Sequence, residues 1–479
     1  MDEKMEYNIS EPDKDDSEKR KKRTFWNFVD NFQGDKVILM IVLLLIAISL
    51  VTIFSSTSGI EEVLKGKATR FDMFTSQAKL ACLGLGIIAA CYLIPSIRLI
   101  KWASKWGFLL SATLLFCLIA GIGAGEINGA KRILVIAGKQ IHIFEVIKVA
   151  MVMYLSWAIH TYKEDDFTLA NRLSKRFKRL SFLNKPLSKR LMYVYLPIII
   201  VVGGMFRGGI SSSAITGMIM FATILIGGMP KKEILGAFSL MVCVIGFFVG
   251  AYFISDGEYF RRVGVAVNRL TLFKEYDIIK TANPRSQEFR DAMDKIRQPE
   301  GAKIAIMEGG ILGKGPGNST QKYSVYAISS DYMFSFIVEE FGLIFGAIPI
   351  IILYVSLLAR GALIVQNCDS VFAKSAVAGL VILITGQAFL HMLINVGIGP
   401  LTGQTLPMVS HGTSSFLVFS VAFGVLLSIS KMAKKQVEMR RRELEIAAAM
   451  EIQAEAAKAA ETAEAEKNNE ENQDREKTE

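Results

Sequence analysis

Apolar and polar positions along this chain are grouped in long blocks. Apolar runs of about 18 to 22 residues recur, which is the length that an α-helix needs to cross about 30 Å of hydrocarbon. The pattern predicts ten membrane-spanning helices, near residues 37–54, 75–95, 107–121, 141–160, 191–206, 211–229, 234–255, 332–357, 371–394 and 413–430. We therefore expect an all-α polytopic membrane protein, because helices satisfy their backbone groups internally in lipid.

Polar segments flank and interrupt this apolar region. Residues 1–34 form a polar N-terminal tail, and residues 433–479 form a charged tail rich in Ala, Glu and Lys. Between them, a ten-helix membrane domain covers residues 35–432, with one large loop at 256–330 between helices seven and eight. The C-terminal tail is expected to be a solvated, partly helical extension, or alternatively a helix that binds a partner.

Basic residues in the short connections predict the orientation of the helices. A KRKKR sequence at Lys19–Arg23 precedes the first helix, and the connections after helices two, four, six and ten also carry an excess of Lys and Arg. All of them lie on one side if both termini are cytoplasmic, where positive loops are preferred. The large loop at 256–330 is then extracytoplasmic.

Composition narrows the class of protein further. The chain has 479 residues, of which 51% are hydrophobic and 21% are charged, which excludes an ordinary cytosolic enzyme and a disordered chain. None of the five cysteines forms a CxxC pair, so neither a disulfide framework nor a zinc site is indicated. The net charge of +10 is typical of positive cytoplasmic loops and does not require a nucleic acid partner.

Charged residues at the fourth helix form the first candidate site. The sequence Asn128-Gly-Ala-Lys131-Arg132 precedes this helix, and Glu145 and Lys148 lie within it. Residues three apart share a helix face, so Glu145 and Lys148 are expected to neutralise each other. They form either a structural ion pair or a charged floor for a polar headgroup. Lys131 and Arg132 are either interface anchors or ligands for phosphate.

A glycine-rich stretch in the outer loop is the second candidate. Gly309–Gly317 reads GGILGKGPG and is followed by Asn318, Ser319, Thr320 and Gln321. Five glycines in nine residues permit tight turns and close approach of the backbone to a ligand. The stretch is not a P-loop, because Pro316 stands where that motif requires Lys. The alternative is a flexible connector.

Acidic residues at the start of the eighth helix form the third candidate. Asp331 is expected where the outer loop enters this helix, and Glu339 and Glu340 follow within it. Asp331 is either a helix cap or a general base beside a cavity. The two glutamates lie deeper, so at least one of them requires a partner.

The fourth candidate is a segment that cannot continue a helix. Asn395–Ser415 reads NVGIGPLTGQTLPMVSHGTSS, and His391 and His411 lie at its two ends. Irregular backbone at membrane depth is tolerated only when it is buried in protein or lines a cavity. We therefore expect a re-entrant segment or a cavity wall. The two histidines are expected to be structural, and their spacing gives no metal site.

Together these segments resemble one family, the SEDS proteins (shape, elongation, division and sporulation). The resemblance covers residues 37–430 and rests on NGAKR at Asn128–Arg132, on Glu145 with Lys148, on Gly309–Gly342 and on Gly403–Ser415. The GPGNS and GQTLP sequences are more similar to division-type members than to elongation-type, rod-shape members.

The resemblance implies a peptidoglycan glycosyltransferase that polymerises lipid II at the outer face of the bacterial cytoplasmic membrane. It implies that Asp331 is the general base. The residues that it implies for substrate binding are Lys131, Arg132, Glu145, Lys148, Lys314, Asn318, Ser319, Gln321, Ser410, Ser414 and Ser415. A divalent cation, Mg or Mn, is conceivable as an aid to the leaving pyrophosphate, but no ligand cluster indicates one.

The same resemblance implies partners and a location. These are an undecaprenyl-pyrophosphate-linked glycan, a membrane-anchored class B penicillin-binding transpeptidase and other cell-division proteins at the septum. Two further functions remain open at this point, a lipid II flippase and a non-catalytic scaffold of the division machinery. A flippase requires polar residues that reach both faces of the membrane, whereas the four candidate sites are predicted near the outer face.

Overall fold

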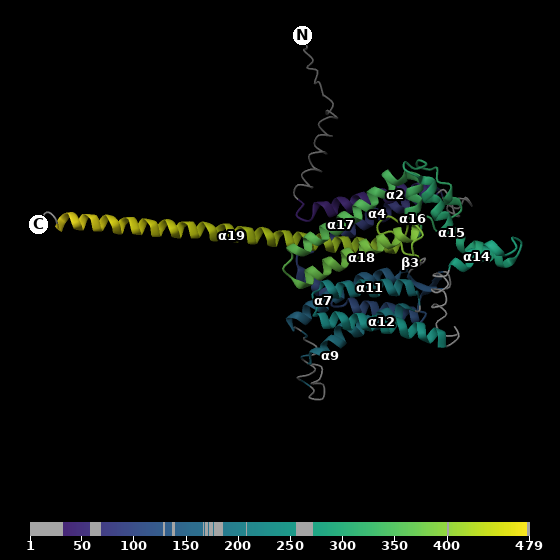
Figure 1. Ribbon diagram of the computed structural model, residues 1–479, viewed down its shortest axis with the longest axis horizontal. Coiled ribbons are helices and arrows are strands. Elements are labelled where there is room, and N and C mark those ends of the chain that lie inside the picture. Colours follow the sequence, from purple (N-terminus) through teal and green to yellow (C-terminus); the bar gives the residue numbers. More distant parts are fainter. Residues whose placement is uncertain are drawn as a thin grey trace, which may run out of the picture.

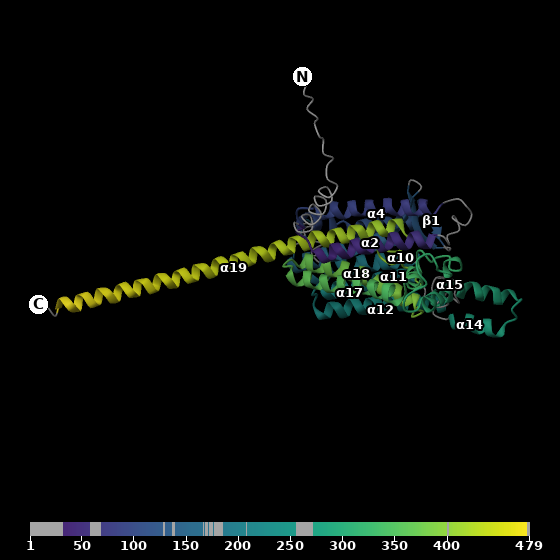
Figure 2. The same ribbon diagram turned by 90° about the horizontal axis from the view of Figure 1, so that it is seen from above.

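The computed structural model describes residues 32–57, 69–127, 130–136, 139–165, 167, 171, 176, 185–206, 208–254, 272–399 and 402–476. Its membrane domain is a bundle of long helices that run in similar directions (Figure 1). Seen from above, α14 and α15 extend beyond one end of the bundle, and α19 leaves the opposite end as a single long rod (Figure 2).

Helices account for most of the described chain. The first part contains α2 (Lys36–Ser56), α4 (Arg70–Tyr92), α5 (Ile97–Ser104), α6 (Gly107–Ile119), α7 (Ile143–Glu164), α9 (Pro186–Arg190), the π-helical η3 (Leu191–Tyr195), α10 (Leu196–Phe206), α11 (Ile210–Ile226) and α12 (Lys231–Ile254). The second part contains α14 (Leu272–Thr281), α15 (Gln287–Gly309), the 3-10 turn η4 (Gln321–Tyr323), α16 (Met333–Gly342), the π-helical η5 (Leu343–Ala347), α17 (Ile348–Asn367), α18 (Val371–Asn395) and α19 (Thr413–Glu476).

Each of the ten predicted spans coincides with one or more of these helices. Among the described residues, eight helical stretches are long and apolar enough to cross a membrane, and α11 is a shorter apolar helix. The predicted fold class, an all-α polytopic membrane protein, is confirmed. The eighth span is longer than predicted, because α16, η5 and α17 form one stretch over Met333–Asn367.

Two helices form the centre of the bundle. Most residues of α7 and of α18 are buried, and the two helices pack against each other. α11 packs on both of them, and α19 packs along α4 and α7. Because the central helices are surrounded by protein, polar side chains on them contact other side chains and not lipid.

A small sheet precedes α7 and was not predicted. β1 (Ala124–Ile127), β2 (Ala130–Ile136) and β3 (Lys139–His142) pair antiparallel in the order β1-β2-β3. The fourth span begins at Ile143, two residues after the predicted position near 141, since Ile141 and His142 belong to β3. Strands of four to seven residues are too short to register in a search for 20-residue apolar runs, although Asn128-Gly129 is a strong hairpin dipeptide.

The two segments outside the bundle are largely helical. The described part of the predicted loop at 256–330 contains α14, α15 and η4, and residues 255–271 lie outside the described residues. α19 continues without interruption from the bundle to Glu476. The predicted boundary at residue 432 is therefore a change in composition within one helix. The predicted N-terminal tail lies almost wholly outside the described residues, which begin at Phe32.

Candidate functional site

The predicted ion pair of α7 lies at the centre of a buried polar cluster. Glu145 and Lys148 occupy the first two turns of α7, and Lys148 is only 1% exposed. Its Nζ lies 2.8 Å from Glu145 Oε1, 2.5 Å from Gln387 Oε1 and 2.9 Å from Gln404 Oε1. An ammonium group has three protons, so this arrangement uses all of them. We call these four residues the Lys148 hub.

The two glutamines of the hub extend it to other segments. Gln404 Nε2 donates to Ser212 Oγ of α11 at 3.0 Å, and Gln387 Nε2 donates to the carbonyl of Thr405 at 3.1 Å. The hub therefore ties α7, α11 and α18 to the segment that follows α18. Within the described part of the chain, Glu145 Oε2 has no hydrogen-bond partner although it is buried. It is an acceptor that lacks a donor.

The non-helical segment between α18 and α19 lies where the sequence predicted a re-entrant segment or a cavity wall, and we call it the re-entrant segment. Its residues from Gln404 to Ser410 are mostly buried, and residues 400–401 of the segment lie outside the described residues. Side chains of the bundle hold its carbonyls: Tyr354 donates to Pro407 at 2.6 Å, and Ser49 donates to Val409 at 2.9 Å. The segment is thus enclosed by protein, as irregular backbone at membrane depth requires.

Three predicted site serines lie in or beside this segment, and their described hydrogen bonds go to the chain itself. Ser410 donates to the carbonyl of Ser330 at 2.7 Å. Ser414 accepts from the amide of His142, and Ser415 bonds the hydroxyl of Thr405. Their binding of a substrate stays a prediction, and their observed contacts join the segment to β3 and to the turn before Asp331.

Asp331 lies two residues before the first residue of α16. Its amide donates to the carbonyl of Ala327 at 2.9 Å, and its side chain is half-buried. A Cβ on the exposed Gly403 would lie 3.4 Å from Asp331 Oδ2, so the carboxylate faces the re-entrant segment. Since Gln404 belongs to the Lys148 hub, Asp331 and the hub meet at two successive residues.

The alternative interpretation of Asp331 as a helix cap is wrong. The N-cap of α16 is Tyr332, which makes no capping bond with its side chain. Instead, the amides of Phe334 and Ser335 donate to His391 Nε2 and Asn395 Oδ1 of α18. The caps thus come from another helix, which sequence spacing along α16 did not reveal.

The glycine-rich stretch binds along the end of α16. Backbone bonds join Lys314 to Glu339, Gly315 to Glu340 and Leu343 to Gly310 at 2.9 to 3.0 Å. A Cβ on Gly313 (φ +83°) would lie 2.6 Å from backbone atoms of Glu340 and Gly342. Only glycine permits so close an approach of two backbones. The alternative interpretation as a flexible connector is therefore wrong for the described stretch.

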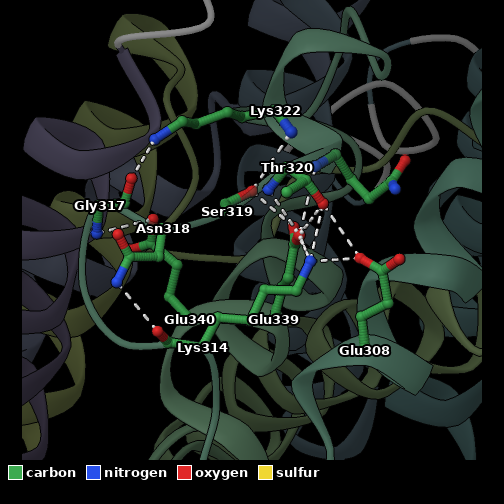
Figure 3. Close-up of polar contacts among 10 residues, drawn as sticks. Glu308, Lys314, Gly317, Asn318, Ser319, Thr320, Lys322, Glu339 and Glu340 are labelled. Atoms are coloured by element: carbon green, nitrogen blue, oxygen red, sulfur yellow. Dashed lines mark hydrogen bonds and ion pairs between the residues drawn. The ribbon is translucent and has the colours of Figure 1, made fainter.

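Glu339 is the centre of a second polar cluster (Figure 3). Its carboxylate is fully buried and accepts from Lys314 Nζ at 2.9 Å, from Ser319 Oγ at 2.5 Å and from the amides of Thr320 and Gln321 at 2.8 and 3.2 Å. These bonds supply the partner that a buried carboxylate requires. Lys314, Ser319 and Gln321, which the resemblance implies for substrate binding, lie together around Glu339, and their binding of a substrate stays a prediction.

Glu340 is buried beside it and joins the same loop to α2. Ser55 Oγ donates to the two carboxylate oxygens at 2.6 and 2.8 Å, and the amide of Gly317 donates at 3.1 Å. Asn318 Nδ2 donates to the carbonyl of Lys314. Both glutamates thus have partners, where the sequence required at least one.

Charges in the glycine-rich loop and on α15 shift two pKa values in this second cluster. Hydrogen bonds from Lys314 and Thr320 hold the pKa of Glu308 below its ordinary value. Partial desolvation lowers the pKa of Lys314, but the bonds and charges of Glu308 and Glu339 outweigh it and leave this pKa raised. Lys314 therefore carries a full positive charge at neutral pH, paired with two carboxylates.

The predicted phosphate ligands, Lys131 and Arg132, lie on β2, which precedes α7 in the chain. Arg132 Nε donates to the carbonyl of Gly208 at 2.6 Å, and its side chain is half-buried. The side chain of Lys131 and the whole of Asn128 lie outside the described residues. Partial burial lowers the pKa of the adjacent His142; the charge of Glu145 opposes the shift, and the charges of Arg132 and Lys148 reinforce it. Arg132 is thus electrostatically coupled to the hub region.

The described residues do not fit a divalent cation held by the protein. In this part of the chain, no three His, Cys, Asp or Glu side chains come together. Glu339 and Glu340 are already bonded to lysine, hydroxyl and amide groups.

Comparisons with known proteins agree with the motifs. The model of the FtsW, RodA and SpoVE family, described as "Cell cycle protein", matches residues 35–435. A probable peptidoglycan glycosyltransferase FtsW of Methylomonas methanica is 28% identical over 83% of this chain and 92% of its own length. The stage V sporulation protein E of Bacillus subtilis is 25% identical over 84% of this chain and 98% of its own length.

Solved structures show the same fold. The rod shape determining protein RodA of Thermus thermophilus superimposes with a TM-score of 0.51 at 18% identity, over 83% of this chain and 96% of that one. A chain of a peptidoglycan synthase complex that coordinates polymerization and crosslinking gives a TM-score of 0.53 at 18% identity, over 84% and 98%. This chain therefore belongs to the FtsW, RodA and SpoVE family, the SEDS proteins that its motifs resemble.

Proposed function

We propose that this chain is a peptidoglycan glycosyltransferase that polymerises lipid II into β-1,4-linked glycan strands. Relatives that match more than four-fifths of the chain are named probable peptidoglycan glycosyltransferases. The reaction takes place at the outer face of the bacterial cytoplasmic membrane during septal cell-wall synthesis. Both termini are then cytoplasmic, and the segment at 256–330 is extracytoplasmic.

One observation carries the proposal: Asp331 and the Lys148 hub meet at Gly403 and Gln404. Asp331 Oδ2 faces Gly403, and the side chain of Gln404 accepts from Lys148 at 2.9 Å. A half-exposed carboxylate is thereby held next to a buried, hydrogen-bonded polar cluster. This is the arrangement that a general base and a binding floor for a sugar headgroup require.

In the proposed reaction Asp331 acts as the general base. Its carboxylate takes the proton of the acceptor sugar's 4-hydroxyl while that oxygen attacks C1 of the donor sugar. The bond from C1 to the pyrophosphate oxygen breaks, and undecaprenyl pyrophosphate leaves. An α-linked donor gives a β-1,4 bond by a single inversion, so one base suffices, unlike the two carboxylates of a glycoside hydrolase.

The leaving pyrophosphate requires positive charge near the outer face. Arg132 and Lys131 of β2 are the proposed ligands. The bond from Arg132 Nε to Gly208 fixes a half-buried guanidinium, whose planar fork of five N–H donors matches the geometry of phosphate. Lys148 has all three protons engaged in the hub, and Lys314 is paired with Glu308 and Glu339. We assign these two lysines to holding the site together.

The distribution of polar residues along α7 favours a transferase over a lipid II flippase. Between Lys148 and His160, the buried side chains of α7 are apolar except for Ser156 and Tyr154. Ser156 donates to a carbonyl of its own helix, and Tyr154 donates to the carbonyl of Tyr193. A transporter needs polar groups along a path between both faces, which this central helix does not supply.

A membrane-anchored class B penicillin-binding transpeptidase is the proposed partner. The fold matches a chain of a peptidoglycan synthase complex in which polymerization and crosslinking are coordinated. Placement at the septum and contacts with other division proteins follow from the FtsW type of the relatives.

The test is lipid II polymerisation by the purified full-length chain with its transpeptidase. Asp331→Asn and Asp331→Ala are expected to lower the rate about 10²- to 10⁴-fold, the usual contribution of a general base. Asp291→Asn, the same change on an exposed acid of α15, serves as the control and keeps the wild-type rate. A near-normal rate of polymerisation by Asp331→Ala would refute the assignment of Asp331 as the general base. Transport of fluorescent lipid II without polymer formation would establish a flippase instead.

A further inference from the structure

The start of α16 depends on side chains of α18. The first amides of a helix have no partner within the helix and are usually satisfied by a cap residue directly before it. In α16 the amide of Phe334 donates to His391 Nε2 at 3.4 Å, and the amide of Ser335 donates to Asn395 Oδ1 at 3.0 Å. The two acceptors lie 57 and 60 residues away along the chain.

Asn395 also fixes the peptide group of Asp331 itself. Its Nδ2 donates to the carbonyl of Asp331 at 3.1 Å and to the carbonyl of His391 at 2.8 Å. Its Oδ1 accepts from the amide and the hydroxyl of Ser335 at 3.0 and 2.8 Å. Two donors and two acceptor positions are all that an amide side chain offers. Asn395 is 1% exposed, so none of these bonds is shared with water.

His391 joins the same helix start to the Lys148 hub. Its Nδ1 lies 2.8 Å from the carbonyl oxygen of Gln404. A carbonyl only accepts, so Nδ1 carries the proton, and Nε2 is the acceptor that faces the amide of Phe334. A path of hydrogen bonds thus runs from Lys148 through Gln404 and His391 to α16.

We propose that Asn395, supported by His391, is a positioning residue for Asp331. From α18, a different helix of the same chain, it caps the N-terminus of α16. It thereby sets where the Asp331 carboxylate lies relative to the Lys148 hub. A cap supplied by Asp331 itself would turn the carboxylate toward its own helix, whereas here it faces Gly403. This inference rests on the proposed function of Asp331 as the base.

The activity test compares variants of Asn395 in the full-length chain with its transpeptidase. A displacement of about 1 Å in a reacting group costs roughly 10²-fold. Asn395→Ala is therefore expected to lower kcat about 10- to 10²-fold with KM for lipid II within about threefold. Asn395→Asp retains the acceptor for Ser335 but loses the donor to Asp331, and we expect an intermediate loss.

Thr385→Val is the matched control. Thr385 is a buried polar residue of the same helix, ten positions earlier, and its hydroxyl donates to the carbonyl of Val381 of its own helix. We expect its kcat to equal the wild-type value within about twofold. A kcat within about twofold of wild type for folded Asn395→Ala would overturn the proposal.

A double variant separates positioning from general damage to the fold. If Asn395 acts through Asp331, then Asn395→Ala causes no further loss in an Asp331→Asn background. An equal further loss in that background would show that Asn395 acts elsewhere and would overturn the proposal. A fully active Asp331→Ala would refute the base itself, which is a distinguishable result.

Hydrogen exchange tests the cap without any activity. The amides of residues 331–336 are expected to exchange at least about tenfold faster in Asn395→Ala than in wild type and at the wild-type rate in Thr385→Val. Unchanged exchange at 331–336 in Asn395→Ala would contradict the capping of α16 by α18, whatever reaction the chain catalyses.

Discussion

Lys148 Nζ and Gln404 Oε1 lie 2.9 Å apart, although 256 residues separate them along the chain. Through this bond the first turns of α7 hold the re-entrant segment in place. Gly403 of that segment is the residue that the Asp331 carboxylate faces. The bond is buried, because Lys148 is 1% and Gln404 5% exposed. The proposed base and the polar floor are thus parts of one network and not two neighbouring sites.

Removal of the Lys148 ammonium is expected to destabilise the whole bundle. Lys148→Met leaves the Glu145 carboxylate buried without its counter-charge and leaves two glutamine oxygens without a donor. Loss of one partner of a buried ion pair costs about 3–5 kcal/mol. Thermal unfolding of the purified chain should show a markedly lower midpoint.

A second substitution tests this reason directly. Glu145→Gln in the Lys148→Met background removes the uncompensated charge and should recover part of the lost stability. Arg440→Met is the control, since Arg440 and Asp369 form an exposed pair that contributes less than about 1 kcal/mol. No recovery in the double variant would mean that the charge of Glu145 is not the cause.

Contacts within one helix could be predicted from the sequence, whereas contacts between distant segments could not. The pairing of Glu145 with Lys148 followed from their spacing of three residues, and the ten spans followed from apolar length. Gln387, Gln404, Ser212 and Asn395 were missed as partners, because the sequence does not show which distant group a neutral amide or hydroxyl side chain contacts. Their partners lie up to 256 residues away.

The glycine-rich stretch illustrates the same limit. Its composition predicted close approach of backbone, but to a ligand, whereas Gly313 approaches the backbone of α16. Gly342 ends α16 with a φ of +71° and thereby frees carbonyls to which the stretch can bond. In three dimensions Gly313 and Gly342 lie against each other's backbone, so the close approach of the two segments requires a glycine at both positions.

Alanine at either of these paired glycines is expected to prevent correct packing. Gly313→Ala would bring a methyl group to 2.6 Å from the backbone of Glu340, and neither backbone can move without breaking the bonds between them. Gly342→Ala meets the backbone of Ile311 at 2.5 Å. We expect both variants to accumulate poorly or to unfold at much lower temperature.

Gly317→Ala separates the cost of a positive φ from the cost of a steric clash with a neighbouring backbone. Gly317 also has a positive φ, +85°, but nothing lies within 4 Å of a Cβ placed there. The strain of a left-handed conformation costs about 1–2 kcal/mol. A loss for Gly313→Ala that is no larger than this would contradict the close approach of the two backbones.

Acid is expected to loosen the second cluster through Glu308. Lys314 and Thr320 hold the pKa of Glu308 below 4.5, so its contribution to stability is fully present above pH 4.5 and is lost as the pH falls through the lowered value. The group is exposed, and solvent limits its effect to less than about 1 kcal/mol. The unfolding midpoint should therefore fall slightly more steeply below pH 4.5 in wild type than in Glu308→Gln.

The end of the bundle from which α19 emerges is held together by Asp35. Its Oδ1 caps α2 by accepting from the amides of Val37 and Ile38, and its Oδ2 accepts from Arg360 of α17 at 2.6 and 2.9 Å. Ser430 of α19 accepts from the Asp35 amide at 2.9 Å. One residue thus joins three helices.

Two substitutions at Asp35 divide these contributions. Asp35→Asn retains an oxygen for the cap but loses the charge that faces Arg360, whereas Asp35→Ala loses both. A helix cap contributes about 0.5–2 kcal/mol, so Asp35→Ala should be less stable than Asp35→Asn by about that amount. In an Arg360→Met background, Asp35→Asn should cost much less than it does in wild type, because the ion pair is already absent. Equal costs in both backgrounds would show that the cost of Asp35→Asn does not come from the ion pair with Arg360.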